Sequence, residues 1–407
     1  MIERSLYTTK IEPFIDKPVI KVITGIRRCG KSELLKIIQQ NLAKKGIDEK
    51  QVVYINYESI RWNDYLTAEK LYSYVEKNKS KDKRTYLFID EIQEVLGWEK
   101  AINSMLADWD VDIYITGSNS RLLSSELATY LTGRYVECRV YPLSFSEFLY
   151  FHKFNDLGRI PVYFDQYLHQ GGFPAFHVAN FSDNTIYQMV KDIYNSVLLR
   201  DTVQRYHIRN IDMLDRLVQF LFDNLGNTFS ATSISKYLKS QGRTTDTETL
   251  YNYIQALEAS FVVNRVRRYD IKGKEYLQTS EKFYVTDPTL IYAGRGCDLR
   301  MMGGLLENLV YLELMRRGYR VSIGKLGDLE VDFVAQRQDE TIYVQVTETM
   351  DSDTTREREL RPLQKIRDNH PKYIVVGNPL QTGTMDGIQC MYIADFLLHK
   401  SEYKRIN

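Results

Sequence analysis

A phosphate-binding loop is the clearest chemical pattern in this chain. Residues 25–32 have the sequence Gly-Ile-Arg-Arg-Cys-Gly-Lys-Ser and match G-x-x-x-x-G-K-[ST] at every fixed position. In this pattern the glycines let backbone N–H groups curl around a phosphate, the lysine reaches the β- and γ-phosphate oxygens, and the final hydroxyl ligates Mg²⁺. We predict that ATP and Mg²⁺ bind here through Gly25, Arg28, Cys29, Gly30, Lys31, Ser32 and Glu33.

Two adjacent acidic residues, Asp90 and Glu91, form the second chemical pattern. They follow an apolar run at residues 86–89, and a strand buried in a parallel sheet presents its carboxyl end to a ligand. We predict that Asp90 holds Mg²⁺ beside Ser32 and that Glu91 polarises the attacking water. Hydrolysis of a phosphoanhydride requires a positioned water and a metal ion that spreads the developing charge. The alternative is a strand that ends in a solvated acidic turn.

The segments around both patterns have the order that such a site requires. An apolar run at residues 19–24 is typical of a buried strand, and Leu34, Ile38 and Leu42 recur behind the loop at helical spacing. From residue 18 to about residue 148, apolar runs alternate with helical patterns. We expect strands at residues 19–24, 52–56, 86–90, 112–116 and 135–140. The alternation predicts an α/β fold with a parallel sheet covered by helices on both faces.

The composition is that of an ordinary soluble protein. The 407 residues are enough for two to four domains, and the formal net charge is only +1. This balance gives no global signal for nucleic acid. The four cysteines are scattered without a C-x-x-C pair, no secretory leader is expected, and no apolar stretch approaches the roughly 18 residues that span a bilayer. We therefore expect a cytoplasmic protein that does not act at a membrane.

Four segments together resemble the ATPase core of AAA+ proteins. They are the phosphate loop, Leu-Phe-Ile-Asp-Glu-Ile-Gln at 87–93, Ile-Thr-Gly-Ser-Asn-Ser at 115–120 and Leu-Thr-Gly-Arg at 131–134. The chain looks most like a prokaryotic branch that carries DNA-binding-like and nuclease-like regions behind this core. The resemblance implies an AAA+ core at residues 1–150, a helical segment at 151–210, a winged helix-like domain at 211–298 and a restriction-endonuclease-like domain at 299–407.

The same resemblance implies roles for several polar residues. Asn119 stands where the family places a sensor for the γ-phosphate or the attacking water, with Ser118 as the alternative. Arg134, behind a helix-like segment at 121–131, stands where AAA+ proteins commonly place an arginine finger for the neighbouring subunit, with Arg121 as the alternative. A finger of this kind implies a homo-oligomer. Asn56 resembles a residue that restrains the catalytic glutamate in some relatives, although an Asn at a strand end is also a common turn former.

The pattern from about residue 211 to 290 is typical of a winged helix-turn-helix. Three amphipathic helical patterns precede β-like segments at 262–269 and 282–285. Cations near Gly273 would face a phosphate backbone, and they are Arg265, Arg267, Arg268, Lys272 and Lys274. Acidic residues on the third helix, Asp246, Glu248 and Glu258, would oppose DNA binding. Two partners therefore stay open for this region, double-stranded DNA and another protein.

The last hundred residues resemble the restriction-endonuclease-like fold with an altered site. In that fold a helix Glu, a strand Asp and an E-x-K pair hold Mg²⁺ and orient water. Glu307 and Asp332 match the first two positions, whereas Gln345 and Thr347 occupy the E-x-K positions. Gln lacks the negative charge that Mg²⁺ requires, and Thr lacks a cation for the scissile phosphate. We predict that this domain is not a nuclease and serves as a binding or assembly surface.

Two functional hypotheses follow from these patterns. The first is an oligomeric Mg²⁺-dependent ATPase whose hydrolysis cycle moves C-terminal domains that bind DNA or protein. The second is a slow ATP-gated binding switch that uses the nucleotide to lock one conformation. A third hypothesis, an ATP-dependent nuclease, is disfavoured by Gln345 and Thr347.

Overall fold

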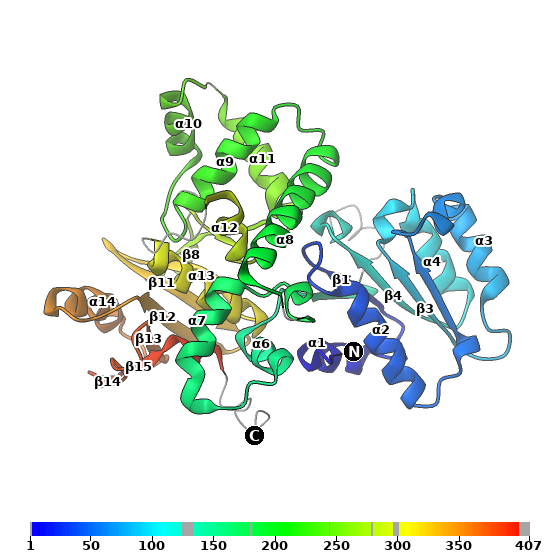
Figure 1. Cartoon of the computed structure of the whole chain (residues 1–407), viewed down its shortest axis with the longest axis horizontal. Helices are drawn as coiled ribbons and strands as arrows, with labels where there is room; N and C mark the ends of the chain where they lie inside the picture. The colour runs from blue at the N-terminus through cyan, green and yellow to red at the C-terminus, as the bar shows by residue number, and fades with distance from the viewer. Residues whose placement is uncertain are drawn as a thin grey trace. The chain divides into compact units, whose positions relative to one another are not determined.

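Two structural units make up the chain in the computed structural model (Figure 1). The structure describes residues 2–123, 133–179, 181–243, 245–277, 280–295 and 301–398. The first unit contains residues 1–141 together with 259–261, and the second contains residues 142–258 and 262–407. None of the helices in the described ranges combines the length and apolar character needed to cross a bilayer.

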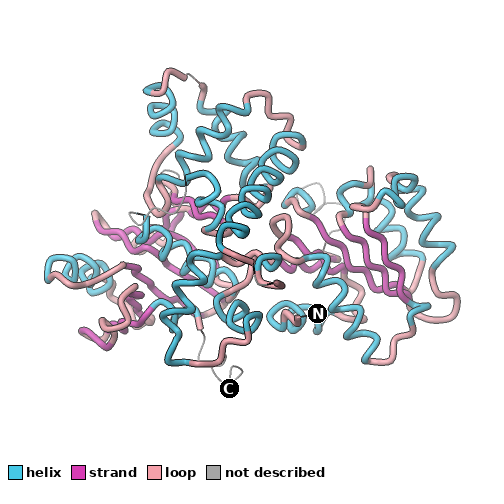
Figure 2. The backbone as a smooth tube through the Cα atoms, in the orientation of Figure 1, coloured by secondary structure: helices cyan, strands magenta, loops and turns pink. Residues whose placement is uncertain are grey.

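A five-stranded parallel sheet forms the centre of the first unit, as the sequence predicts. Its strands are β1 (Ile20–Thr24), β2 (Val52–Asn56), β3 (Thr85–Asp90), β4 (Val111–Gly117) and β5 (Tyr135–Arg139). The strand order is β2-β3-β4-β1-β5, so β4 lies between the strand before the phosphate loop and the strand before the acidic pair. Figure 2 shows these strands in magenta with helices around them.

Helices cover both faces of this sheet. The helices of the first unit are α1 (Ser5–Ile11), α2 (Lys31–Lys44), α3 (Ala68–Asn78) and α4 (Trp98–Asp108). Leu71 of α3 and Ile102 of α4 belong to one hydrophobic cluster with the strands. Leu34 and Leu35 of α2 are fully buried outside that cluster. Amphipathic helices on the two faces therefore enclose strands that are mostly apolar, as expected of a parallel sheet.

One buried ion pair interrupts the apolar centre of this sheet. Lys21 of β1 and Asp112 of β4 form an ion pair, and the side chains are 0% and 1% exposed. The carboxylate of Asp112 also accepts hydrogen bonds from the Tyr114 hydroxyl, at 2.9 Å, and from the backbone N–H of Asp16, at 3.0 Å. Burial lowers the pKa of Lys21, and the charge of Asp112 opposes that shift. The pair fastens β1 to β4.

The second unit is built on an eight-stranded mixed sheet with the order β14-β15-β13-β12-β11-β10-β7-β8. Its strands are β7 (Arg268–Asp270), β8 (Glu275–Tyr276), β10 (Arg320–Leu326), β11 (Leu329–Arg337), β12 (Glu340–Thr347), β13 (Lys372–Val376), β14 (Gly383–Met385) and β15 (Ile388–Tyr392). The helices of this unit are α6 (Phe145–His152), α7 (Ile160–Gln170), α8 (Asp183–Ser196), α9 (Ile211–Asp223), α10 (Ala231–Ser240), α11 (Thr247–Ala259), α12 (Thr289–Arg295), α13 (Met302–Arg316), α14 (Asp353–Lys365) and α15 (Ile393–Leu397).

The two long helices α13 and α14 pack on opposite faces of this sheet. Phe333 of β11 contacts the ring of Tyr311 on α13, whereas the next residue, Val334, clusters with Leu360 and Leu363 of α14. Successive side chains of a strand point to opposite faces. Val334 therefore lies on the face of the sheet against which α14 packs, and we call this the α14 face. Other residues of the strands are assigned to this face by the same alternation.

The predicted wing differs from the observed arrangement. β6 (Val263–Val266) pairs with β9 (Lys282–Val285) as an antiparallel two-stranded sheet. The β7–β8 hairpin between them instead extends the eight-stranded sheet, because β7 pairs with β10. The single β-like segment expected at 262–269 is therefore two strands in two different sheets. Arg265 is also paired with Glu258 and Glu281, at 3.2 and 3.7 Å.

Removing one member of the Lys21–Asp112 pair should destabilise the folded protein. Asp112→Ala leaves the ammonium of Lys21 buried without its carboxylate, so the free energy of unfolding should fall by about 3–5 kcal/mol. A Lys21→Met/Asp112→Leu double variant fills the same space with apolar groups and should recover most of that loss. Urea unfolding measures both changes. A single variant as stable as the parent would show that the pair does not hold the sheet together.

Candidate functional site

The phosphate loop joins β1 to α2, and two glycines shape it. Gly25 has φ +148°, and a Cβ at this position would lie 2.2 Å from the carbonyl oxygen of Val140. Gly30 has φ +101° and precedes Lys31, the first residue of α2. The first backbone N–H groups of a helix have no partner within it and favour an anion. The loop leaves no space for a side chain at Gly25, and the N-terminus of α2 follows it. This arrangement fits a bound phosphate.

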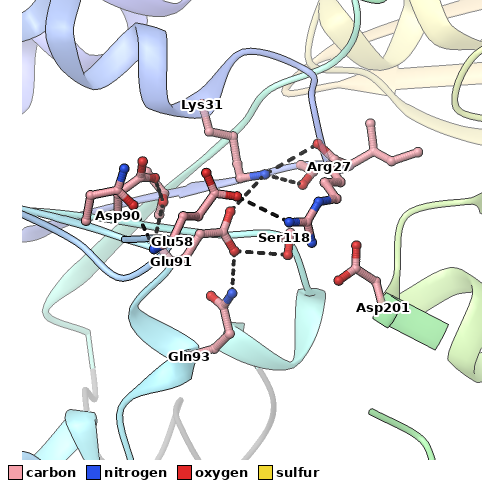
Figure 3. Close-up of polar contacts among 12 residues, drawn as sticks. Arg27, Lys31, Glu58, Asp90, Glu91, Gln93, Ser118 and Asp201 are labelled. Carbon is pink, nitrogen blue, oxygen red and sulfur yellow. Dashed lines mark hydrogen bonds and ion pairs between the residues drawn. The ribbon is translucent and has the colours of Figure 1, made fainter. Parts of the chain in front are cut away.

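Lys31 lies inside this loop and is only 4% exposed. Its ammonium donates to the carbonyl oxygens of Gly25 and Ile26, at 3.1 and 3.4 Å. The same nitrogen lies 3.6 Å from a carboxylate oxygen of Glu91 (Figure 3). These partners include two neutral carbonyl oxygens and one carboxylate at the edge of ion-pairing distance. Phosphate oxygens would compete well with them for the ammonium.

Asp90 ends β3 beside the loop and is fully buried. The hydroxyl of Thr116 on β4 donates to its carboxylate, and the hydroxyl of Ser32 lies close enough to act on the pKa of the same carboxyl. Burial raises the pKa of Asp90, and these two hydroxyls oppose the shift. The structure therefore brings Ser32 and Asp90 together. A hydroxyl and a carboxylate are oxygen ligands of the kind that Mg²⁺ prefers.

Glu91 is positioned by β4 and by its own backbone. It has φ +56°, a left-handed conformation that is rare for a residue with a side chain. Its backbone N–H donates to the Thr116 hydroxyl at 2.9 Å. Its carboxylate accepts hydrogen bonds from the Ser118 hydroxyl, at 3.1 Å, and from the Gln93 amide. Figure 3 shows Lys31, Ser118 and Gln93 around this carboxylate.

The other predicted contact residues divide into buried and exposed groups. Asn119 is buried two residues beyond β4, and the pairing of Gly117 with Thr24 brings this turn beside the phosphate loop. Cys29 is fully buried, and burial raises the pKa of its thiol. Arg28 is exposed. Glu33 pairs with Lys36 at the surface, at 2.6 Å, and so points away from the buried groups.

Arg134 lies at the other end of the sheet from the loop. Its carbonyl oxygen accepts a hydrogen bond from Ile20 N–H, at 2.8 Å, and Ile20 is the first residue of β1. The length of β1, about 13 Å at 3.3 Å per residue, therefore separates Arg134 from the loop. The structure does not bring Arg134 to the chain's own site, and its role toward a neighbouring subunit remains a prediction. The side chain of Arg121 and residues 124–132 lie outside the described residues.

Two residues near the amino terminus support the loop, and sequence reasoning missed both of them. The guanidinium of Arg4 is 3% exposed and donates to the carbonyl oxygens of Cys29, at 2.8 Å, and Tyr141, at 3.0 Å. The hydroxyl of Tyr7 accepts a hydrogen bond from the Tyr141 backbone N–H, at 3.0 Å. Arg4 thus ties the loop to the residue at the end of the first unit. A basic residue in a polar segment resembles any surface residue in the sequence.

A second acidic cluster lies where β11 of the eight-stranded sheet meets α13 and β9, and it contains Glu307 and Asp332. The ammonium of Lys282 on β9 lies between them, 2.9 Å from Glu307, 3.2 Å from Asp332 and 3.0 Å from Glu330. Gln345 is also near, since its carbonyl oxygen accepts from Asp332 N–H at 3.2 Å.

This second cluster does not fit a metal ion. Thr347 is not part of it and donates to the carbonyl oxygen of Thr349. The Lys282 ammonium occupies the position between the carboxylates that a cation would need, and within the described ranges no group of His, Cys, Asp and Glu side chains is arranged to hold a metal. That this part of the chain lacks nuclease activity stays a prediction.

Three carboxylates share one ammonium in this cluster, so it is short of positive charge. Burial and the neighbouring Asp332 raise the pKa of Glu307 to about 7. The Tyr284 hydroxyl donates to Glu307 and partly opposes that shift. Burial alone would lower the pKa of Lys282, but the three carboxylates raise it well above its usual value. Lys282 therefore stays charged at all ordinary pH values.

Sequence comparison identifies an AAA domain in the first part of the chain. A family model described as an AAA domain matches residues 17–149, and one described as a domain of unknown function matches residues 162–299. A protein of Haemophilus influenzae is 37% identical over 401 residues, which are 98% of this chain and 99% of the relative. The protein MJ1544 of Methanocaldococcus jannaschii is 31% identical over 359 residues, 85% of this chain and 78% of the relative. Both are described as uncharacterized proteins.

Solved structures resemble the chain only at low scores. The ORC1 protein of Aeropyrum pernix, in complex with DNA, has a TM-score of 0.34 at 12% identity and covers 72% of this chain and 92% of its own. AMPPCP-bound DnaA from Aquifex aeolicus has a TM-score of 0.30 at 15% identity, covering 62% and 86%. Likenesses of this size add no detail to the site. The AAA match confirms the predicted P-loop core, whereas the winged helix-like and endonuclease-like regions remain predictions.

Glu307 should make the stability of the protein depend on pH. Its pKa is about 7 in the folded chain and 4.5 as the ordinary value, so the folded state binds more protons between these values. The free energy of unfolding should therefore fall as the pH rises through this range, by at most about 1.4 kcal/mol per pH unit. Urea unfolding across that range measures the slope. Glu307→Gln should flatten the dependence of the unfolding free energy on pH, whereas Glu357→Gln, the control at an exposed position, should leave it unchanged. Equal slopes in the parent and in both variants would contradict the raised pKa of Glu307.

Proposed function

This chain belongs to the same protein family as these bacterial and archaeal relatives and contains a P-loop AAA domain, and from that premise we propose that it binds ATP with Mg²⁺ and hydrolyses it. The observation that carries the proposal is the convergence of Lys31, Ser32, Asp90 and Glu91 at one edge of the parallel sheet. Ligands of open α/β sheets bind at this carboxyl edge.

Different residues of the site would hold the phosphates and the metal ion of the nucleotide. The backbone N–H groups at the start of α2 and the ammonium of Lys31 would hold the phosphates, and Ser32 and Asp90 would hold Mg²⁺. When bound, Mg²⁺–ATP supplies the phosphoanhydride and a metal charge that stabilises the transferring phosphoryl group. Lys31 would exchange the carbonyl oxygens of Gly25 and Ile26 for phosphate oxygens.

Glu91 is the group best placed to handle the proton of the attacking water. Ser118 and Gln93 donate to its carboxylate and so fix its orientation. A carboxylate held in this way accepts a hydrogen bond from a water molecule and orients it for attack. Asn119 would assist from the neighbouring turn. Removal of the carboxylate charge should therefore affect turnover far more than binding.

Hydrolysis would serve to change the conformation of the C-terminal part, which would bind DNA or protein. We propose a homo-oligomer in which Arg134 completes the site of the neighbouring subunit, since a guanidinium stabilises transition-state charge and makes hydrolysis depend on assembly. The position of Arg134 at the sheet edge away from its own loop supports a role toward a neighbour.

A slow binding switch is the second candidate function. The contact between Lys31 and Glu91 favours it, because a carboxylate held near the lysine must be released before it can act on water. The two candidates differ in steady-state turnover. Stimulation of turnover by DNA supports a motor, whereas nucleotide-dependent affinity with negligible turnover supports a switch.

Glu91→Gln should separate binding from hydrolysis. The amide keeps the size of the side chain but is a poor proton acceptor, so kcat should fall about 10²–10⁴-fold, while the affinity for ATP should change little. Phosphate release gives the rate, and calorimetry gives the affinity. Glu94→Gln, which changes an exposed carboxylate three residues away, is the matched control. Normal turnover in Glu91→Gln would show that another group activates the water.

Mixing two inactive variants tests Arg134 in trans. Arg134→Ala alone should lower kcat about 10³-fold or more, as for other arginine fingers. In mixed oligomers of Arg134→Ala and Glu91→Gln, some sites combine an intact Glu91 with an intact Arg134 from the neighbour, so part of the turnover should return. Light scattering with a slowly hydrolysed ATP analogue confirms that mixed oligomers form. Confirmed mixed oligomers without any recovery would exclude the trans role.

A further inference from the structure

A large cavity opens on the α14 face of the eight-stranded sheet. Its volume is about 940 Å³, near the upper end of the range for ligand sites. Val334 of β11 and Tyr343 of β12 line it, and Val334 marks the α14 face. The far side is formed by Tyr269 and Ile271, from β7 and the hairpin turn that follows it. We call this space the basic cavity, for the side chains at its rim.

Four basic side chains from two distant segments surround the basic cavity. Lys272 and Lys274 lie in the turn between β7 and β8, Lys365 is the last residue of α14, and Arg367 follows it. All four are exposed, and no carboxylate in the described part of the chain lies within ion-pairing distance of any of them. The Asp270 carboxylate of the same turn acts on Lys272, but it does not line the cavity. Side chains of one charge sign that gather around a hollow attract a polyanion.

The carboxylate at this rim does not cancel the cations. Asp368 lines the cavity, but it accepts hydrogen bonds from the Tyr343 hydroxyl, at 2.7 Å, and from the backbone N–H of His370, at 3.1 Å. Four cations against this one carboxylate leave a net charge of +3 on the lining. The basic cavity is therefore positive although the whole chain has a net charge of only +1.

Two accessible aromatic rings line the cavity as well. They belong to Tyr269, which is half-buried, and His370, which is exposed. Tyr343 also lines the cavity but is only 5% exposed, and its ring lies 6.3 Å from that of His370. Proteins that bind single-stranded nucleic acid combine a positive groove for the backbone with rings on which bases stack. Paired bases in a duplex do not offer their faces for stacking, so this lining selects a single strand.

We infer that the basic cavity binds a segment of single-stranded nucleic acid, with Lys272, Lys274, Lys365 and Arg367 on its phosphates and the aromatic rings against its bases. This site does not depend on the ATPase chemistry, and it differs from the predicted helix-turn-helix surface. It uses the hairpin that the sequence assigned to a wing, but it combines that hairpin with residues about ninety positions further along the chain.

Fluorescence anisotropy with a labelled dT₂₀ strand tests this inference on the full chain. Binding should weaken with salt, and each lost phosphate contact should reduce the slope of log K against log[salt] by about 0.7. Lys365→Ala/Arg367→Ala should therefore reduce the slope by about 1.4, and Lys272→Ala/Lys274→Ala should do the same. Lys236→Ala/Lys239→Ala, which removes two exposed cations from α10, is the control and should keep the parental slope. Thermal unfolding confirms that each variant folds.

Each of the following four outcomes would overturn the inference. A parent that does not bind dT₂₀ at 50 mM salt excludes the site. An effect of the Lys272/Lys274 pair without an effect of the Lys365/Arg367 pair assigns binding to a wing and not to the cavity. An equal loss in the α10 control places the strand on the helices. A duplex of the same length that binds more tightly than the single strand would contradict the role of the aromatic rings.

Discussion

Charged groups buried at the carboxyl edge of the five-stranded sheet must find partners inside the chain, and this constraint determines the geometry of the site. Isolated buried charges are very unfavourable. Asp90 and Glu91 obtain hydroxyl partners from Thr116 and Ser118 because β4 lies between β1 and β3. The strand order thus serves the chemistry directly, since β4 delivers the hydroxyls that hold both carboxylates in place.

Two of the buried lysines, Lys282 and Lys31, show how the same constraint gives different outcomes. Lys282 has three carboxylates within 2.9–3.2 Å. These partners leave the ammonium little to gain from any ligand, and it fastens β9 to the second sheet. Lys31 has two carbonyl oxygens and one carboxylate at 3.6 Å. Carbonyl oxygens carry no full negative charge, so phosphate oxygens can replace them. We therefore regard the first cluster as a binding site and the second as a structural contact.

Much of the first unit follows from the sequence, because its signals are local. Buried parallel strands are continuous apolar runs, which can be recognised in the sequence. The strand β2 coincides with the expected residues 52–56, and the other four strands begin and end within one residue of the expected positions. The contacts that the sequence did not reveal are all non-local. Lys21 and Asp112 lie within apolar runs that give no indication of a partner, and Arg4 meets the loop only after folding. The hairpin at Gly273 has a clear turn signal, but nothing local shows that its strands join β10.

The central claim is that the glycine turn and Lys31 hold a triphosphate together with Mg²⁺. Isothermal titration calorimetry of the folded protein with ATP, in the presence and absence of Mg²⁺, tests it most directly. We predict saturable heat with one nucleotide per chain, weaker binding without the metal, and no detectable heat for Lys31→Met, whose side chain fills the same space without a charge. If folded parental protein shows no heat with Mg²⁺–ATP, or if Lys31→Met binds as tightly as the parent, the claim is wrong.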